Sequence, residues 1–150
     1  AAATVWRGTP GPSGLRAFAF DTLHVPADRD KLRFEHRDGK LRNLLDRSVP
    51  ELAASAVGRL WHAGGPRPVA QVVAHTGGRD VLEALAPVVA PHSLDASVRV
   101  LRANGNMSSP SVLFALEETL KNAAPSPADG DFWLVSFGAG FSAHSCRIGL

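Results

Sequence analysis

The stretch VAQVVAHTGGRDVLEAL, residues 69–85, decides the fold class because it joins a buried-strand pattern to a helical pattern. Val69 to His75 is a short apolar run of the kind that forms a strand covered on both faces. Thr76-Gly77-Gly78 follows as a tight turn, and Arg79 to Val89 has the apolar spacing of a helix. A buried strand that passes through a turn into a helix is typical of an α/β fold.

Downstream of this stretch, the pattern predicts two more helices and a closing pair of strands. The expected elements are a short helix capped by Ser93 or Asp95 and reaching Arg102, a helix from Pro110 to about Asn122, and strands over Phe132–Phe137 and Phe141–Ile148. The longer helix is expected to bury its apolar stripe, which consists of Val112, Leu113, Leu116 and Leu120.

Upstream, the sequence predicts strands and one further helix. The expected elements are a short strand over residues 1–8, a strand over Leu15–Val25, a hairpin of Lys31–His36 and Lys40–Leu45 around Asp38-Gly39, and a helix capped by Ser48 that reaches about Trp61. Because strands and helices alternate, the 150 residues are expected to form one α/β domain whose mixed sheet is flanked by helices.

The charge balance and hydropathy exclude two classes of function. The 16 Lys and Arg residues against 14 Asp and Glu residues leave a net charge of +2, so the pI of about 9.2 reflects no basic face. The chain has no run of basic residues with interleaved aromatics, which argues against nucleic-acid binding. It also has no apolar stretch of the roughly 20 residues that a membrane-spanning helix needs.

The single cysteine, Cys146, cannot form a disulfide within the chain, which favours a reducing, cytoplasmic location. It also excludes a cysteine-based zinc site built from this chain alone. The chain starts at Ala1 without an initiator Met or a secretory leader, inside the predicted first strand. We therefore expect the true start to lie upstream, with this chain being a fragment or a processed half.

Two polar residues occupy positions that suit catalysis. His75 stands at the carboxyl end of the predicted buried strand, where catalytic groups gather in α/β sheets. Asn106 lies between Gly105 and the start of a helix, where the helix dipole favours negative charge. Each position also has an ordinary structural interpretation, His75 as a hydrogen-bonded strand-end residue and Asn106 as a helix N-cap.

Three longer blocks favour the catalytic interpretation. They are VAHTGGRDVLEAL (residues 73–85), GNMSSPSVLFALEE (105–118) and SFGAGFSAHSCRI (136–148). In this order they resemble signature blocks in the C-terminal half of chalcone synthase-like enzymes, the type III polyketide synthases, which have a thiolase-like fold. Ala1-Ala2-Ala3 and the segment from Leu44 to Pro50 also resemble the corresponding parts of that family.

The resemblance implies an acyltransferase that performs a decarboxylative Claisen condensation. His75 matches the catalytic His of the family and Asn106 matches its catalytic Asn. They would act with a nucleophilic Cys from an N-terminal half that this chain lacks. The substrates would be acyl and malonyl thioesters of coenzyme A or of an acyl carrier protein, with no permanently bound cofactor. The resemblance also implies a homodimer.

Further residues match the walls of the family's active site. Gly77 and Gly78 would keep the wall of the pantetheine tunnel low. Gly138, Ala139 and Gly140 match the loop that shapes the product cavity, with Ala139 in place of a Pro. Asn43 falls near a position often occupied by a gatekeeper Phe. Cys146 lies in an apolar strand near the C-terminus, so it is expected to be a core residue and not the nucleophile.

Three alternatives stay open at the level of sequence. The enzyme could join two carrier-protein-bound chains once, or it could be a ketoacyl-synthase III of fatty acid synthesis, although the GNMSS block favours the polyketide branch. The chain could instead be a non-catalytic structural partner subunit. In every case, this chain alone is expected to be inactive and to expose a large apolar face, because it would hold half of a two-part core.

Overall fold

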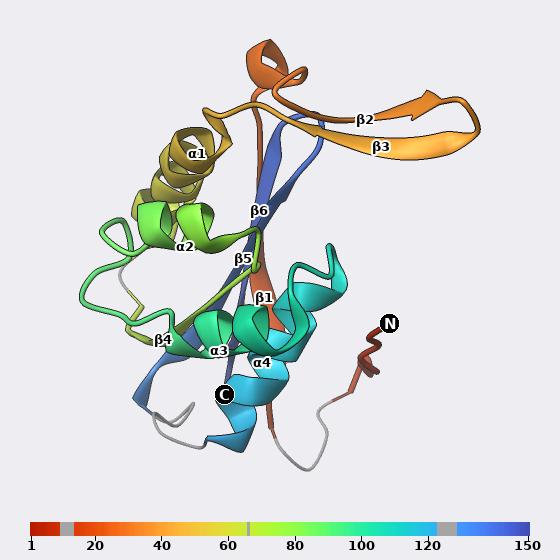
Figure 1. Cartoon of the computed structure of the whole chain (residues 1–150). Coiled ribbons are helices and arrows are strands. Elements are labelled where there is room, and N and C mark those ends of the chain that lie inside the picture. Colours follow the sequence, from red (N-terminus) through yellow and green to blue (C-terminus); the bar gives the residue numbers. More distant parts are fainter. Residues whose placement is uncertain (10–13, 66, 123–128) are drawn as a thin grey trace.

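The computed structural model describes residues 1–9, 14–65, 67–122 and 129–150. A four-stranded sheet forms its centre (Figure 1) and has the order β1 (Arg16–His24), β6 (Ser142–Gly149), β5 (Asp131–Gly138) and β4 (Val69–Ala74). β4 and β5 run parallel, whereas β5 pairs with β6 and β6 with β1 in antiparallel fashion. The predicted α/β class with a mixed sheet is therefore confirmed.

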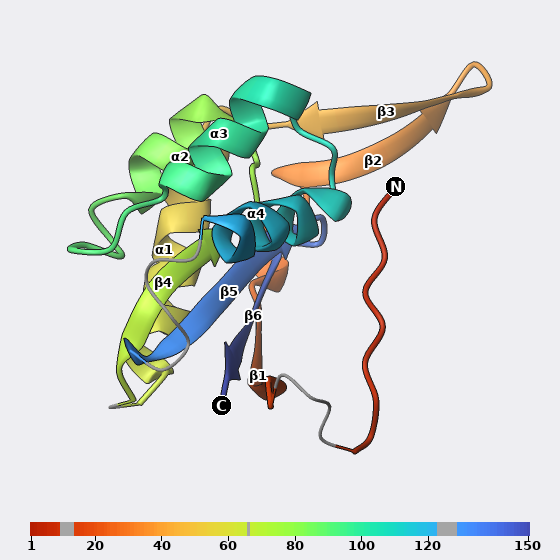
Figure 2. The same cartoon turned by 90° about the horizontal axis from the view of Figure 1, so that it is seen from below.

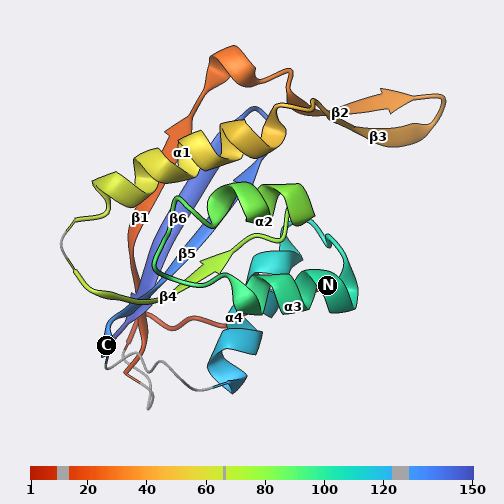
Figure 3. The same cartoon turned by 60° about the vertical axis from the view of Figure 1, so that its left-hand side comes forward.

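Helices cover both faces of this sheet (Figure 3). They are α1 (Val49–Ala63), α2 (Arg79–Leu85), α3 (Asp95–Asn104) and α4 (Pro110–Lys121), and a short 3-10 turn spans Pro26–Asp28. Side chains alternate between the faces of a strand. Val72 and Ala74 of β4 accordingly pack in the cluster under α1 and α2, whereas Val73 packs with α3 and α4. This two-sided burial explains why β4 reads as a continuous apolar run.

A separate two-stranded hairpin projects from the body of the molecule (Figures 1 and 2). It consists of β2 (Leu32–Arg37) and β3 (Lys40–Leu45). Asp38 has φ +53° and Gly39 has φ +71°, the left-handed pair that a two-residue type I′ turn requires. The Asp-Gly signal thus placed the turn correctly. In the register of the hairpin, Phe34 lies opposite Asn43.

Three details of the prediction differ from the structure: one strand, one helix end and one capping hydrogen bond. Residues 1–7 form no regular element, and Val5 is 90% exposed, because none of the described strands pairs with them. α2 ends at Leu85 and not at Val89, because Pro87 lacks the N–H that would continue the helical hydrogen bonds. Ser48 occupies the N-cap of α1 but makes no side-chain cap.

The Ser48 hydroxyl instead donates to Asp46 Oδ1 at 2.6 Å. The backbone N–H of Ser48 donates to the same oxygen at 2.9 Å. These two hydrogen bonds lower the pKa of Asp46 to about 2. The turn before α1 is therefore organised by Asp46.

The buried face of α4 matches the predicted apolar stripe only in part, because Leu116 is buried but small residues fill the rest of that face. Its buried residues are Ser111, Ala115, Leu116 and Thr119, whereas Leu120 is 44% exposed. Small side chains on the inner face let a helix approach its neighbours closely, here α3, β4 and β5. Leu113 and Leu116 line an apolar groove of about 750 Å³ together with residues that include Phe20, Leu134 and Ile148.

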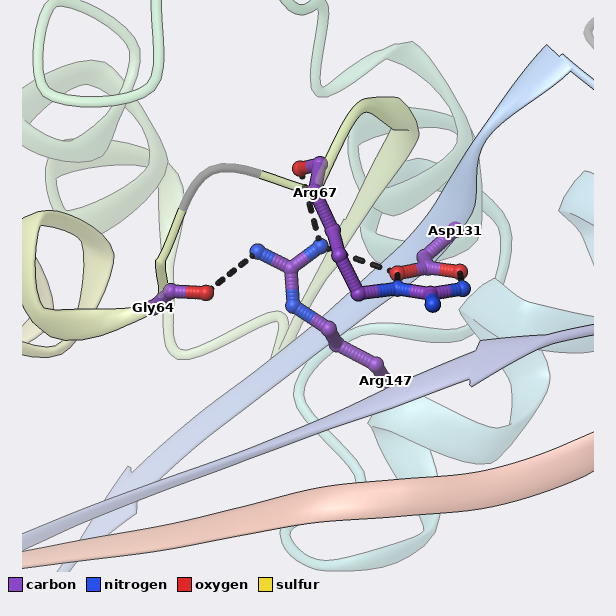
Figure 4. A network of polar contacts seen from close by, with 4 residues as sticks. All are labelled: Gly64, Arg67, Asp131 and Arg147. Atoms are coloured by element: carbon purple, nitrogen blue, oxygen red, sulfur yellow. Dashed lines mark hydrogen bonds and ion pairs between the residues drawn. The ribbon is translucent and has the colours of Figure 1, made fainter.

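A buried ion network holds the amino-terminal ends of β4 and β5 together (Figure 4). The Asp131 side chain is 3% exposed and accepts two hydrogen bonds from Arg67, at 2.8 and 2.9 Å. Arg147, itself 5% exposed at its side chain, donates to Asp131 at 3.0 Å. It also donates to the carbonyl oxygens of Gly64 and Arg67. Hydrogen bonds from these two guanidinium groups hold the pKa of Asp131 below its ordinary value.

Candidate active site

A cleft of about 660 Å³ opens at the opposite end of the sheet, where β4 and β5 finish. Its walls come from five parts of the chain: the hairpin, the start of α1, the end of β4, the start of α4 with the connection before it, and the β5–β6 pair. The lining residues are Leu32, Phe34, Asn43, Leu45, Val49, His75, Gly77, Asn106, Ser108, Ser109, Val112, Leu113, Ser136, Phe137, Gly138, Ala139 and His144. The fold thus gathers into one cleft residues that lie far apart in the sequence.

His75 directly follows β4, and its backbone N–H donates to the Val135 carbonyl of β5 at 2.8 Å. Its imidazole meets the Phe137 ring edge-on, with ring centroids 5.2 Å apart. The residue is 8% exposed, and this burial lowers its pKa below the ordinary value of 6.5. The ring is therefore neutral at pH 7 and can present one N–H donor.

Asn106 follows Gly105, which has φ +70° and ends α3. The Asn106 side-chain Nδ2 donates to the Gly77 carbonyl at 3.0 Å, and its Oδ1 accepts from the Ser108 N–H at 2.8 Å. The Gly77 N–H in turn donates to the His75 carbonyl at 2.9 Å. A carboxamide carries two N–H donors, so one remains for a ligand after the bond to Gly77.

The structure corrects one interpretation of Asn106. The residue is not a helix N-cap, because α4 begins at Pro110 and Ser109 occupies its N-cap. Asn106 instead lies in the connection before α4 and ties that connection to the turn after β4. His75 and Asn106 are therefore linked through Gly77, although 30 residues separate them in the chain.

The other expected site residues divide into two groups. Asn43, Gly77, Gly138 and Ala139 line the cleft. Gly78 and Gly140 are not among the residues that line it. Gly78 has φ +147° at the start of α2, and Gly140 has φ +103° in the turn between β5 and β6, so the backbone path there favours glycine.

Gly77 is expected to tolerate no side chain. A Cβ added there would lie 2.5 Å from Phe137 Cζ, and the Phe137 ring is already packed against His75 and stacked on Phe141. Gly77→Ala should therefore lower the free energy of unfolding by about 1–3 kcal/mol through overpacking. Urea denaturation measures this loss. Gly138→Ala is the matched control, because its Cβ would meet no atom within 4 Å, and an equal loss in both variants would contradict the packing argument.

The sequence interpretation missed several cleft residues. Phe34 could have been found from Asn43, because the Asp-Gly turn sets the two residues opposite each other. Ser136 and His144 depend on the register of β5 against β6, which pairs them directly. No signal in the sequence alone gives that register across the turn between the two strands.

Cys146 lies apart from this cleft, in the groove beside α4 with Leu116 and Leu134. Burial raises its pKa, which disfavours the thiolate needed in a nucleophile. Within the ranges that the structure describes, no group of three His, Cys, Asp or Glu residues could hold a metal ion. None of the helices in those ranges is long and apolar enough to cross a bilayer.

Comparison with known proteins shows what the chain is similar to. No protein-family model matches it. The 3,5-dihydroxyphenylacetyl-CoA synthase of Streptomyces toyocaensis is 28% identical over 151 residues, which cover 93% of this chain and 38% of the relative. This chain thus spans about two fifths of the length of that relative.

Solved structures have the same fold. The 1,3,6,8-tetrahydroxynaphthalene synthase of Streptomyces coelicolor A3(2), a bacterial type III polyketide synthase, is 25% identical with a TM-score of 0.76, covering 95% of this chain and 42% of its own. Germicidin synthase of Streptomyces coelicolor, also a type III polyketide synthase, is 23% identical with a TM-score of 0.78, covering 94% of this chain and 39% of its own.

Proposed function

Because the chain has the thiolase-like fold of type III polyketide synthases and is similar to them in sequence, we propose that it forms part of a ketosynthase of that kind. The proposed reaction is the decarboxylative condensation of an acyl thioester with a malonyl-type thioester. One observation carries the proposal: His75 and Asn106 line the same cleft and are joined through Gly77. In the proposed reaction, side-chain N–H groups of both residues donate to one oxygen atom of the substrate.

The chemistry starts with an acyl group bound to a cysteine sulfur. A malonyl thioester then binds with its thioester carbonyl oxygen at the N–H groups of His75 and Asn106. Loss of carbon dioxide leaves the electron pair of the broken bond as an enolate, whose negative charge rests on this oxygen. Donors already in place lower the energy of that charge. The enolate carbon attacks the acyl carbonyl, a carbon–carbon bond forms, and the cysteine leaves as its thiolate.

The proposed nucleophile comes from outside these 150 residues. Cys146 lies in a different hollow from His75, and burial disfavours its thiolate. The exposed apolar groove beside α4 favours a second part that packs on this chain, because Phe20, which lines the groove, is 72% exposed. We call this chain together with the part that carries the cysteine the complete enzyme.

Asn106→Ala in the complete enzyme tests the proposal. It removes one of two donors to the enolate oxygen and should slow malonyl decarboxylation by roughly 10²-fold. The assay measures release of carbon dioxide from a labelled malonyl thioester. The matched control is Asn104→Ala, because the Asn104 side chain bonds the Val100 carbonyl within α3 and lies outside the cleft. Unchanged decarboxylation by Asn106→Ala would refute the assigned role.

A further inference from the structure

The two faces of the projecting hairpin differ in chemistry. Directly opposed residues of paired antiparallel strands share one face of a sheet. One face carries the pairs Leu32 with Leu45, Phe34 with Asn43, and His36 with Leu41, and the other carries Arg33 with Leu44, Glu35 with Arg42, and Arg37 with Lys40. The first two pairs of the first face line the cleft. We call the second face the outer face of the hairpin, because it is turned away from the cleft.

The outer face is basic. Four of its six residues are Arg or Lys, and Glu35 is the one acid among them. The hairpin and the residues that flank it, 31–46, hold five of the 16 Lys and Arg residues of the chain and three of its 14 Asp and Glu residues. The other 134 residues hold 11 of each kind, so the net charge of +2 belongs to this segment. The prediction of no basic face is therefore wrong for the hairpin, where strand pairing gathers the cations on one side.

The cations of the outer face are available to a partner. All four are exposed, namely Arg33, Arg37, Lys40 and Arg42. Arg33 Nη1 lies 3.7 Å from Glu35 Oε2 in a partly solvated ion pair. Lys40 and Arg42 form no ion pair with any residue that the structure describes. The outer face therefore offers positive charge that the chain itself does not neutralise.

Two of these cations are placed at a cost to the hairpin. Arg37 and Lys40 stand directly opposite each other beside the Asp38-Gly39 turn. Like charges at directly opposed positions destabilise a pair of strands. Both side chains are exposed and lie outside the cleft, so neither fills the core nor contacts a ligand bound there. Their arrangement suits binding to a partner better than it suits the fold.

We propose that the outer face of the hairpin docks an acidic protein that carries the thioester substrate to the cleft. This docking surface rests on the proposed function, since it assigns the donor of the thioester. Residues of the two faces alternate along each strand. The cleft wall at Phe34 and the cations of the outer face are therefore separated by the thickness of one sheet. A protein held on the outer face stands beside the cleft that receives its substrate.

The spacing of the charges favours a protein over a small anion. Arg33 and Arg37 lie four residues apart on β2, roughly 13 Å, and the two strands lie roughly 5 Å apart. A single phosphate group cannot contact cations at both ends of this face, whereas carboxylates spread over a protein surface can. The outer face has no aromatic side chain that could stack on bases, which disfavours a nucleic acid. Opposite charges on two proteins raise the rate at which they associate and orient their encounter.

The test compares one malonyl group on two carriers. The complete enzyme is offered malonyl bound to an acidic acyl carrier protein of fatty acid synthesis or to coenzyme A, and kcat/KM for decarboxylation is measured for each. Arg37→Glu with Lys40→Glu should lower kcat/KM for the carrier protein by roughly tenfold and keep the value for malonyl-coenzyme A within about twofold. Equal losses for the two substrates, or no loss for the carrier protein, would overturn the docking surface.

Two double variants serve as controls for the reversed charges. Arg37→Lys with Lys40→Arg keeps both positive charges on the outer face and should keep kcat/KM for both substrates. Arg59→Glu with Lys121→Glu changes the net charge of the chain by the same amount at exposed positions of α1 and α4. An equal loss for the carrier protein in this second control would show that overall charge, and not the hairpin, attracts it.

Binding separates failure of the docking surface from failure of the proposed function. The unloaded carrier protein is titrated against the same variants by isothermal calorimetry at about 50 mM and about 300 mM NaCl. A loss of affinity in the charge-reversed hairpin variant that shrinks at the higher salt supports docking even if no malonyl group is decarboxylated. No binding to the unmodified enzyme overturns it, as does tighter binding of duplex DNA or of phosphatidylglycerol vesicles at the same residues. If the carrier protein binds but neither malonyl thioester is decarboxylated, the proposed condensation fails and the docking surface stands.

Discussion

Replacing His75 by alanine in the complete enzyme is expected to lower kcat/KM for condensation by roughly 10³-fold or more. The change removes an N–H donor to the enolate oxygen, which alone accounts for roughly 10²–10³. It also removes the imidazole that would pair with the cysteine thiolate. Burial lowers the pKa of His75, and a thiolate beside the ring would raise that pKa again through ion pairing. The measurement is the rate of malonyl decarboxylation together with the rate of acyl loading.

His92→Ala is the matched control for His75. The His92 ring packs edge-on against Trp61, with centroids 5.5 Å apart, and His92 does not line the cleft. The variant His92→Ala should therefore leave the rates of malonyl decarboxylation and acyl loading unchanged. Normal condensation by His75→Ala would remove the basis for the proposed mechanism. Normal acyl loading together with lost decarboxylation would limit the role of His75 to stabilising the enolate oxygen.

Removing the Asp131 carboxylate is expected to give the largest loss of stability. Asp131→Ala leaves the Arg147 guanidinium buried without its counter-charge, although the carbonyls of Gly64 and Arg67 still accept from it. Breaking a buried pair from one side typically costs about 3–5 kcal/mol. Urea denaturation measures the change, and fluorescence of the packed pair Trp61 and Trp133, 4.9 Å apart, reports the core.

Two comparisons isolate the buried charge as the cause. Asp80→Ala breaks a pair with Arg79 whose side chains are 72% and 82% exposed, so it should change the free energy of unfolding by less than about 1 kcal/mol. The double variant Asp131→Leu with Arg147→Met removes both charges and should lose less stability than Asp131→Ala alone. Equal losses in the single and double variants would show that packing, and not charge, dominates.

Periodicity and turn chemistry predicted most of the elements correctly. The apolar run of β4 and the Asp38-Gly39 turn each had a local cause, so sequence alone could place them. The end of α2 had a local cause as well, Pro87, which the predicted helix ran through. The burial of Ser111, Ala115 and Thr119 on α4 had no such local cause. Hydropathy locates the apolar stripe of a helix, but the surrounding structure decides whether small residues such as Ala115 face the core instead.

The candidate site could be predicted only where motifs mark it. His75 and Asn106 lie in separate sequence blocks, and the bond from Asn106 to Gly77 that links them depends on tertiary structure. Asn43 and Ala139 were expected in the cleft and line it. His144 reaches the cleft through the pairing of β6 with β5, which sets a cross-strand position that no local pattern encodes.

The projecting hairpin gives the cleft an exchangeable outer wall. Phe34 and Asn43 stand on a two-stranded sheet that pairs with no strand of the central sheet. Backbone hydrogen bonds from Asp46 to Lys31 and from Gly140 to Leu32 fasten its base. A hairpin from another enzyme, grafted between Lys31 and Asp46, would therefore change the shape of the cleft mouth while His75, Asn106 and the central sheet keep their surroundings. The hairpin can therefore be exchanged to change which ligands enter the cleft.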